Sequence, residues 1–477
     1  MSTAPAVALT LLVLAATGAL PVLLTVGPRL VALPLFPLAG AVLGAVSAGC
    51  SIALAGSMVM WFIIWSLAAA AAGAWYLARR PELGRAMVRA LRGGVPPLVG
   101  AGAVAVALAV AWTLRTLTVP NVGYDTRTIW LIHARWLTQG HAFALAAARN
   151  HFLVVTHPGY PPLISSVMAL AWRVSGTSTD RVAVVMVAML NACALLVAGW
   201  GIVEAARRGA ARLHPEGRRP QLLLAAGIVA AVVVVVVAGG VLGTFFTNGY
   251  ADPLWSLAAV SAVVYGLVLP MTRSDLAVAA VMIAVAGLTK IEGTAVALVL
   301  LFVITAREVA RRRALAAPSL GPRQFSSVLA AALALLTWPV LTEWLGMPTD
   351  PSLSGVRQGS LASRAHGTFS AMVPHLHVLG LAAVCSVAGF ALLRPLRARL
   401  GLGHDGWTWV AVVAAIIVLG GAYVLGPGNV ELWLDTSINR TTIFVALLGW
   451  WIVALWAFCG SAGASTYAGA WQQAPVP

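Results

Sequence analysis

The sequence predicts an all-α polytopic membrane protein with about thirteen transmembrane helices and with juxtamembrane helices on its outer face. Of the 477 residues, 60% are hydrophobic and 9% are charged, whereas a soluble domain carries roughly 25% charged residues. Apolar runs long enough to cross about 30 Å of hydrocarbon recur along the whole chain. Short arginine clusters separate these runs, as in the cytoplasmic loops of multi-pass proteins.

The apolar runs predict where the spans lie. Transmembrane helices are expected near residues 5–26, 31–53, 56–78, 96–117, 181–206, 221–246, 252–270, 275–290, 291–306, 326–346, 375–393, 407–426 and 441–460. Residues 161–174 are also apolar, but a run of this length is more typical of an interfacial or re-entrant segment. We expect it to form an outer-face juxtamembrane helix, which places the basic clusters 79–92, 207–219, 307–323 and 394–399 in the cytoplasm.

This topology accounts for the net charge of +16. The excess of arginine follows the positive-inside rule, so it indicates a multi-pass protein of the cell membrane, in contact with lipid, and does not indicate a nucleic-acid partner. Most acidic residues fall on the non-cytoplasmic side, in five short stretches. Ionisable residues near membrane depth are functional candidates, so the candidate site is expected on that face. The four cysteines lie singly within apolar runs and are interpreted as core residues.

The first outer stretch reads YDTRTIWLIHARW and follows the expected span at 96–117. Asp125 lies between Tyr124 and Arg127, and His133 follows on a nearby face of the expected helix. Asp125 can act as a general base or bind a cation, kept ionised by the neighbouring arginine. It can equally cap the helix, and the sequence leaves both roles open.

Two further stretches combine turn residues with polar side chains. In THPGYPPL the prolines and the glycine fix a turn, and His157 and Tyr160 are either interfacial anchors or substrate contacts. In TNGYADPLW, Asn248, Tyr250 and Asp252 are polar groups at the turn where one helix ends and the next begins. Because a proline follows Asp252 at the helix start, capping is favoured there over substrate binding.

The fourth stretch, GLTKIEGT, contains Lys290, the only lysine of the chain, and Glu292. An ammonium at this depth needs an anion, which is either Glu292 or a bound phosphate. The fifth stretch, ELWLDTSINR, brings Asp435 and Arg440 to the outer mouth of the last span. Arg364, in the second large outer loop, is a candidate for a further phosphate contact, although a solvated loop residue is the simpler interpretation.

The sequence contains no HExxH motif, cysteine cluster or calcium-binding loop, and no P-loop or GxGxxG motif. Neither a metal site nor a nucleotide donor is therefore predicted, and the sequence requires no cofactor.

Taken in order, the motifs YDTRTIW, HPGYPPL, NGYADPL, GLTKIEG and LWLDTSINR resemble the GT-C superfamily of membrane glycosyltransferases over about residues 121–440. The resemblance implies a GT-C-like transmembrane core at 96–460, with outer loops at 118–160 and 347–374. Accessory transmembrane helices at 1–95 precede this core, and a polar tail at 461–477 follows it. The N-terminal helices depart from the simplest members, in which the first outer loop follows the first span.

The resemblance also implies a reaction. Such enzymes transfer a sugar from a polyprenyl-phosphate donor to a glycan or glycolipid acceptor on the non-cytoplasmic face, and inversion is expected. Asp125 matches the general base, Lys290 matches the lysine that contacts the donor phosphate, and Arg440 is similar to a late arginine of some relatives. Residues 157–162 match the stretch that shapes the lipid-facing cavity. Some relatives use a divalent cation, which is compatible with this chain.

The expected sugar is arabinofuranose or mannose, because the Ala/Arg/Gly/Val-rich composition with one lysine is typical of high-GC bacteria. A secondary transporter is an alternative from another class, but it should show repeated halves and charges near the midplane. A third alternative is a ligase of lipid-linked polymers or an assembly partner, and a ligase is expected to rely on cations in a large late loop.

Overall fold

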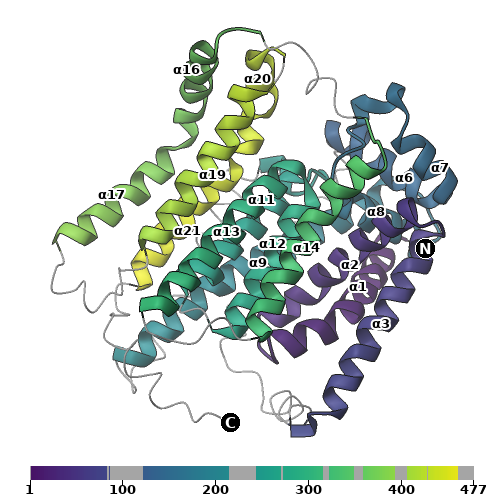
Figure 1. The fold of residues 1–477 in the computed structure, drawn as a ribbon, viewed down its shortest axis with the longest axis horizontal. Coiled ribbons are helices and arrows are strands. Elements are labelled where there is room, and N and C mark those ends of the chain that lie inside the picture. The colour runs from purple at the N-terminus through teal and green to yellow at the C-terminus, as the bar shows by residue number, and fades with distance from the viewer. Residues whose placement is uncertain are drawn as a thin grey trace.

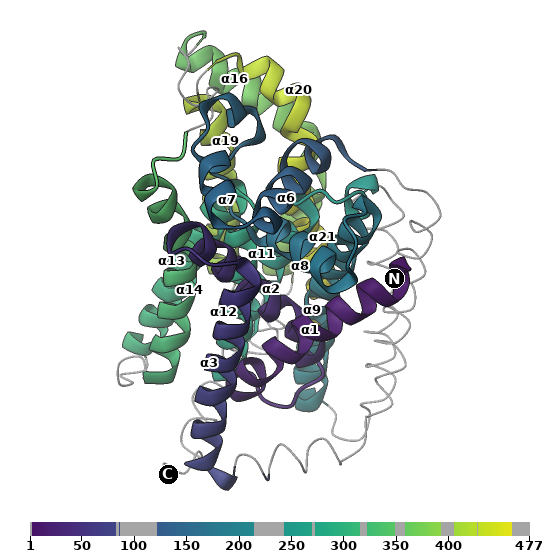
Figure 2. The ribbon, with the colours of Figure 1, turned by 90° about the vertical axis from the view of Figure 1, so that its right-hand side faces the viewer.

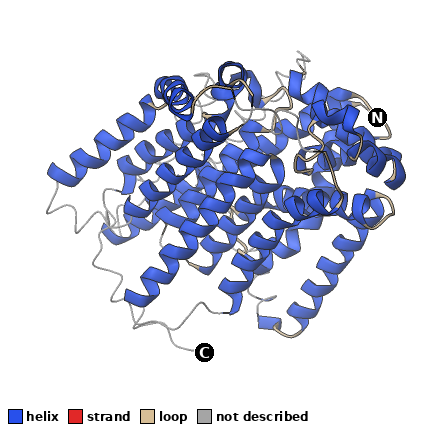
Figure 3. Cartoon of the chain, turned by 45° about the horizontal axis from the view of Figure 1, so that its top comes forward, coloured by secondary structure: helices blue, strands red, loops and turns tan. Residues whose placement is uncertain are grey.

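The computed structural model of the chain describes residues 2–82, 85, 122–213, 243–269, 272–314, 322–348, 358–392, 405–426 and 428–459. Throughout these ranges the regular secondary structure is helical, and they contain no strand (Figure 3). Most of the long helices run side by side in one bundle (Figure 1). The predicted all-α class is confirmed for this part of the chain.

Seven helices in the described ranges are long and apolar enough to cross a membrane. They are α1 (Thr3–Thr25), α2 (Ala32–Ala53), α3 (Met58–Ala78), α9 (Asp180–Leu213), α13 (Ile291–Ala314), α14 (Pro322–Trp344) and α19 (Asp405–Leu425). An eighth span results if α16 (Leu361–Met372) and α17 (His377–Leu392), which are bent by 68°, form one broken span. The chain is therefore a membrane-spanning helical protein, but the expected number of about thirteen spans is not confirmed.

Part of the difference comes from three helices that are shorter than expected spans. They are α11 (Asp252–Val263), which a π-helical turn (Val264–Val268) continues, α12 (Arg273–Thr289) and α21 (Ile443–Cys459). The latter two have 17 residues each, which corresponds to about 25 Å of helix. The expected span at 96–117, and most of the one at 221–246, lie outside the described residues.

Helix α11 occupies the centre of the bundle. Every one of its residues is buried, and it packs against α9, α12, α13 and α21 (Figure 1). Small and apolar residues cover all sides of α11, as expected for a helix that is surrounded by protein. The packing of α11 therefore holds its first residue, Asp252, in a fixed position.

The N-terminal helices belong to the same bundle. Helices α1 and α2 cross closely at Gly18 and Gly40, where an added Cβ would overlap with backbone atoms of the facing helix, as is common where small residues let membrane helices approach. Helix α2 also packs against α9, α12 and α8 (Leu163–Ser175). The proposed boundary between an accessory segment at 1–95 and a core at 96–460 remains a prediction.

Helix α8 differs from the expected surface helix. All but two of its residues are buried, because α1, α2, α6 (Leu131–Gln139) and α9 enclose it. It leads through Gly176 directly into α9, and the Trp172 indole donates to the Thr179 carbonyl at 2.9 Å. Residues 161–174 thus form a short helix that is covered by protein and does not lie on the lipid surface.

One end of the bundle carries the outer stretches. A π-helical turn (Thr126–Trp130), α6 and α7 (His141–Ala148) lie on one side of this end, and α16 and α20 (Val430–Thr441) protrude on the other (Figures 1 and 2). Helices α9, α11, α13 and α21 begin here. At the opposite end of the bundle, arginines directly follow α3 and occupy the last turns of α9 and α13.

Candidate functional site

The first outer stretch is held against the turn before α11. The carbonyl of Asn248 accepts hydrogen bonds from the Gly123 amide at 3.0 Å and from the Thr126 hydroxyl at 2.9 Å. Asn248 is buried, and Gly249 next to it adopts a φ of +86°, a left-handed conformation that favours glycine. Asn248 therefore joins two loops, and the structure shows it in contact with backbone atoms.

Asp125 forms an ion pair with Arg440 from the last turn of α20. Asp125 makes no side-chain capping bond at its helix start, so the capping alternative is wrong. Both side chains are largely buried, with 15% of Asp125 and 13% of Arg440 exposed. Burial opposes the charge of Arg440, but Asp252 and Asp125 outweigh it and raise the pKa of Arg440 above its usual value.

A second group forms where three helix ends meet. The Lys290 Nζ atom lies between α12 and α13 and donates to Asp252 Oδ1 at 2.9 Å. It also lies 3.2 Å from Glu292 Oε1. Lys290 and Asp252 are almost fully buried, whereas 21% of the Glu292 side chain is exposed. The favoured capping role of Asp252 is wrong: its Oδ1 atom accepts from Lys290, its Oδ2 atom has no hydrogen-bond partner within the described part of the chain, and the residue at the N-cap position is Ala251. The Asp252 carboxylate therefore pairs with the lysine, as Glu292 does.

The two groups form one electrostatic unit. Arg440 acts on both Asp252 and Lys290, and Asp252 in turn stabilises the Arg440 cation. We call this unit the charged cluster and define it by Asp125, Asp252, Lys290, Glu292 and Arg440. Three carboxylates face two cations, so the cluster combines anion-binding groups with a carboxylate that can accept a proton.

Two tyrosines border the charged cluster near Lys290. Tyr160 interacts electrostatically with Lys290, and Tyr423 interacts with both Lys290 and Glu292. The Tyr423 hydroxyl is 2.8 Å from the hydroxyls of both Ser437 and Thr441. This network joins α19 to α20 and so supports the helix that carries Arg440.

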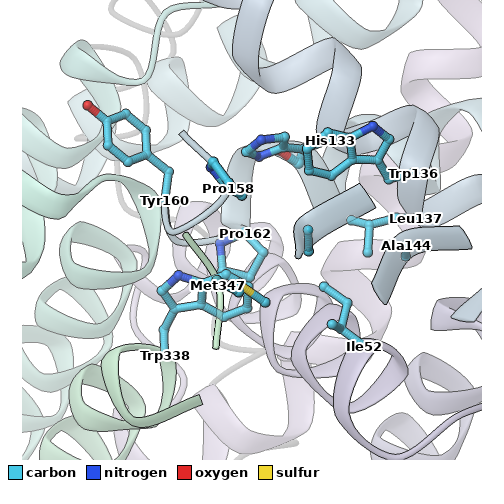
Figure 4. Close-up of a pocket in the computed structure, with 12 residues that line it drawn as sticks. Ile52, His133, Trp136, Leu137, Ala144, Pro158, Tyr160, Pro162, Trp338 and Met347 are labelled. Carbon is cyan, nitrogen blue, oxygen red and sulfur yellow. The ribbon is translucent and has the colours of Figure 1, made fainter. Parts of the chain in front are cut away.

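An aromatic recess lies next to the charged cluster, on the side of Tyr160. It is small, with a cavity volume of about 20 Å³, and Figure 4 shows its main lining residues, Ile52, His133, Trp136, Leu137, Ala144, Pro158, Tyr160, Pro162, Trp338 and Met347. The Tyr160 hydroxyl points away from His133 and Trp136 (Figure 4), so the residue contributes its ring to the recess. The Trp338 indole donates to the Gly159 carbonyl at 2.8 Å and fixes the turn.

Two histidines support this recess. His157 adopts a left-handed φ of 53°, and its ring stacks on Tyr160 at 4.7 Å. His133 is buried, and burial together with the proximity of His157 lowers the pKa of His133 to about 3. His133 is therefore neutral at physiological pH and contributes an uncharged ring.

Besides His133, His157, Tyr160 and Asn248, four further predicted residues lie outside the charged cluster. The Arg364 guanidinium is buried and donates to the carbonyls of Gln358, Tyr423, Val424, Gly426 and Gly428, at 2.6 to 3.1 Å. Arg364 therefore fixes α16 to the end of α19, and its prediction as a phosphate ligand is not carried forward. Tyr124, Arg127 and Asp435 are exposed at the rim.

Two site residues were assigned no role from the sequence. Tyr250 lies within the TNGYADPLW motif, and its ring faces the Arg440 guanidinium at 5.1 Å from the ring centre, but nothing in the motif distinguishes it from an interfacial anchor. Tyr423 lies inside an apolar run and carries no sequence signal. Among the described residues, no group of three or more His, Cys, Asp or Glu side chains is arranged to hold a metal ion.

Comparisons with protein-family models, curated proteins and solved structures give no match to this chain.

Proposed function

We propose that this protein is a GT-C-type glycosyltransferase that transfers a sugar from a polyprenyl-phosphate donor to a hydroxyl of an envelope glycan or glycolipid. The site would face the non-cytoplasmic side, opposite the arginine-rich helix ends. One observation carries the proposal: Asp125 and Lys290, which are far apart in the sequence, belong to one charged cluster through Arg440.

The two cations suit the donor phosphate. The bond between the anomeric carbon and the phosphate oxygen breaks, and the departing polyprenyl phosphate gains negative charge. Lys290 and Arg440 stabilise this charge, and such preorganised contacts contribute most when water is excluded. Each cation is paired with carboxylates, so donor binding exchanges one anion for another.

Asp125 suits the acceptor side of the reaction. As the acceptor oxygen bonds to the anomeric carbon, its proton passes to the Asp125 carboxylate. When Arg440 turns to the phosphate, the Asp125 carboxylate loses its ion-pair partner and can accept the proton of the acceptor hydroxyl. In-line displacement of this kind inverts the anomeric configuration and needs no covalent enzyme intermediate.

The aromatic recess offers a lipid-linked donor an apolar surface and not a cavity for its chain. Its lining is largely apolar and aromatic, and Tyr160 connects it to Lys290, but its volume of about 20 Å³ suffices for about one water molecule. An isoprenoid chain that lies against this lining from the bilayer would place its phosphate near the charged cluster. The position of the charged residues at helix termini also favours this reading over a transporter, whose charged site is expected near the midplane.

The test uses purified protein in nanodiscs, polyprenyl-phosphate mannose or arabinofuranose, and a glycan acceptor. Asp125→Asn should lower kcat by about 100-fold or more, since a general base contributes 10²–10⁴-fold. The matched control is Asp180→Asn, because Asp180 pairs with Arg135 on the solvated surface and should retain full activity. Wild-type rates in the Asp125 variant would refute the assignment of the base.

A further inference from the structure

Tyr250 connects the two halves of the charged cluster without belonging to either ion pair. Its ring lies against the Arg440 guanidinium, 5.1 Å from the ring centre. The same guanidinium pairs with Asp125 and is stabilised by Asp252. A planar guanidinium can turn over an aromatic face and keep its contact.

The ring itself is held from several sides. An added Cβ on Gly123 would overlap with the Tyr250 ring, so this loop approaches the ring as closely as glycine allows. Phe245 meets the ring edge-on at 5.2 Å. Burial raises the pKa of the Tyr250 hydroxyl, while hydrogen bonds from the backbone of Asp125 and Tyr124 act in the opposite direction. The position of Tyr250 is therefore determined by the loop that carries Asp125.

We propose that Tyr250 is a positioning residue that holds the Arg440 guanidinium where it can pass from Asp125 to the donor phosphate. This inference rests on the proposed function, because it concerns the same site. Arg440 has a long side chain, and ordering such a chain costs conformational entropy. The ring of Tyr250 lowers this entropy cost, because it limits the Arg440 guanidinium to one plane beside Asp125 and the donor phosphate.

The two parts of Tyr250 have separable effects. The hydroxyl faces the backbone of Tyr124 and Asp125, whereas the ring faces Arg440. Tyr250→Phe keeps the ring and should keep Arg440 in place. Tyr250→Leu removes the aromatic face, and a cation–π contact at a partly buried site corresponds to roughly tenfold in binding.

The first experiment does not depend on enzymatic activity. Phenylglyoxal modifies accessible arginines, and peptide mass spectrometry measures its rate at Arg440 in the intact protein in nanodiscs. We expect severalfold faster modification of Arg440 in Tyr250→Leu and wild-type rates in Tyr250→Phe. The matched control is Tyr76→Leu, which removes a distant ring that faces Arg80 and should leave Arg440 unchanged. An unchanged rate at Arg440 in Tyr250→Leu would overturn the inference.

A second variant tests the inference even if Tyr250→Leu does not fold. Gly123→Ala keeps the tyrosine but forces its ring to move, so it should also expose Arg440, and protection equal to wild type would count against the inference. In the transfer assay, Tyr250→Leu should raise the donor KM about tenfold, with a smaller change in kcat, and Tyr250→Phe should restore it. An unchanged donor KM in an active Tyr250→Leu protein would also overturn it. If the modification rates change as expected but wild-type protein transfers no sugar, the proposed function fails while the placement of Arg440 stands.

Discussion

Replacing Lys290 tests whether the charged cluster is a buried electrostatic unit. Lys290 and Asp252 expose only 4% and 1% of their side chains, so Lys290→Met leaves the Asp252 carboxylate buried and without its cation. Removal of one partner from a buried pair costs about 3–5 kcal/mol. Glu292 contributes less to this cost, because 21% of its side chain is exposed and solvent reaches it.

The double variant Lys290→Met/Asp252→Leu separates stability from function. It leaves no unpaired charge at α11, so it should recover most of the lost free energy of unfolding, since buried pairs replaced by apolar residues are often neutral or stabilising. Donor affinity should stay low in both variants, because both lack the ammonium.

The assay is equilibrium unfolding in mixed micelles, followed by the fluorescence of the 18 tryptophans. The control is Arg135→Met, which breaks an exposed pair with Asp180 and should cost less than about 1 kcal/mol. A loss below about 1 kcal/mol in Lys290→Met, or a double variant as unstable as the single one, would refute the reasoning.

Three further predictions follow from contacts outside the ion pairs. Arg364→Met should lower the free energy of unfolding by about 2–4 kcal/mol, since five buried or partly buried carbonyls lose their donor, while donor binding measured by calorimetry should stay within twofold of wild type. Gly40→Ala should cost about 1–3 kcal/mol, because the new methyl group meets the backbone of Leu14, and cysteine cross-linking between α1 and α2 should slow. His133 has a pKa of about 3 in the folded protein and 6.5 when unfolded, so the unfolded state binds the additional proton between these values. Stability should fall by about 1.4 kcal/mol per pH unit as the pH drops from 6.5 toward 3, and His133→Phe should flatten this slope in chemical unfolding curves.

Hydropathy predicted the helices well because the hydrocarbon core of a bilayer accepts only apolar segments whose backbone hydrogen bonds are satisfied within a helix. Each expected span within the described residues coincides with a helix, although several are too short to be counted as spans by themselves. Helix α8 shows the limit of this reasoning, because a short apolar segment has the same hydropathy whether lipid or protein surrounds it. Its burial depends on α1, α2, α6 and α9, which hydropathy does not place.

The charged cluster shows a second limit. Sequence order indicated that Asp125, Lys290 and Arg440 belong to one face, and the structure brings them together. The same reasoning placed Arg364 beside them, because a charge in an outer loop does not reveal which carbonyls lie within its reach. Tyr250 was missed as a site residue because its contact with Arg440 joins segments that are distant in the sequence.

The enclosure of α11 has a consequence for biogenesis. With the π-helical turn that continues it to Val268, this helix is still shorter than the roughly 20 residues of a typical span, and it begins with a carboxylate, so it is poorly suited to be stable alone in a bilayer. It needs α9, which precedes it in the chain, and α12, α13 and α21, which follow it. Asp252 and Lys290 can therefore reach their fully enclosed environment only after α21 has been synthesised, although α12 and α13, which bring the lysine to α11, are made before it.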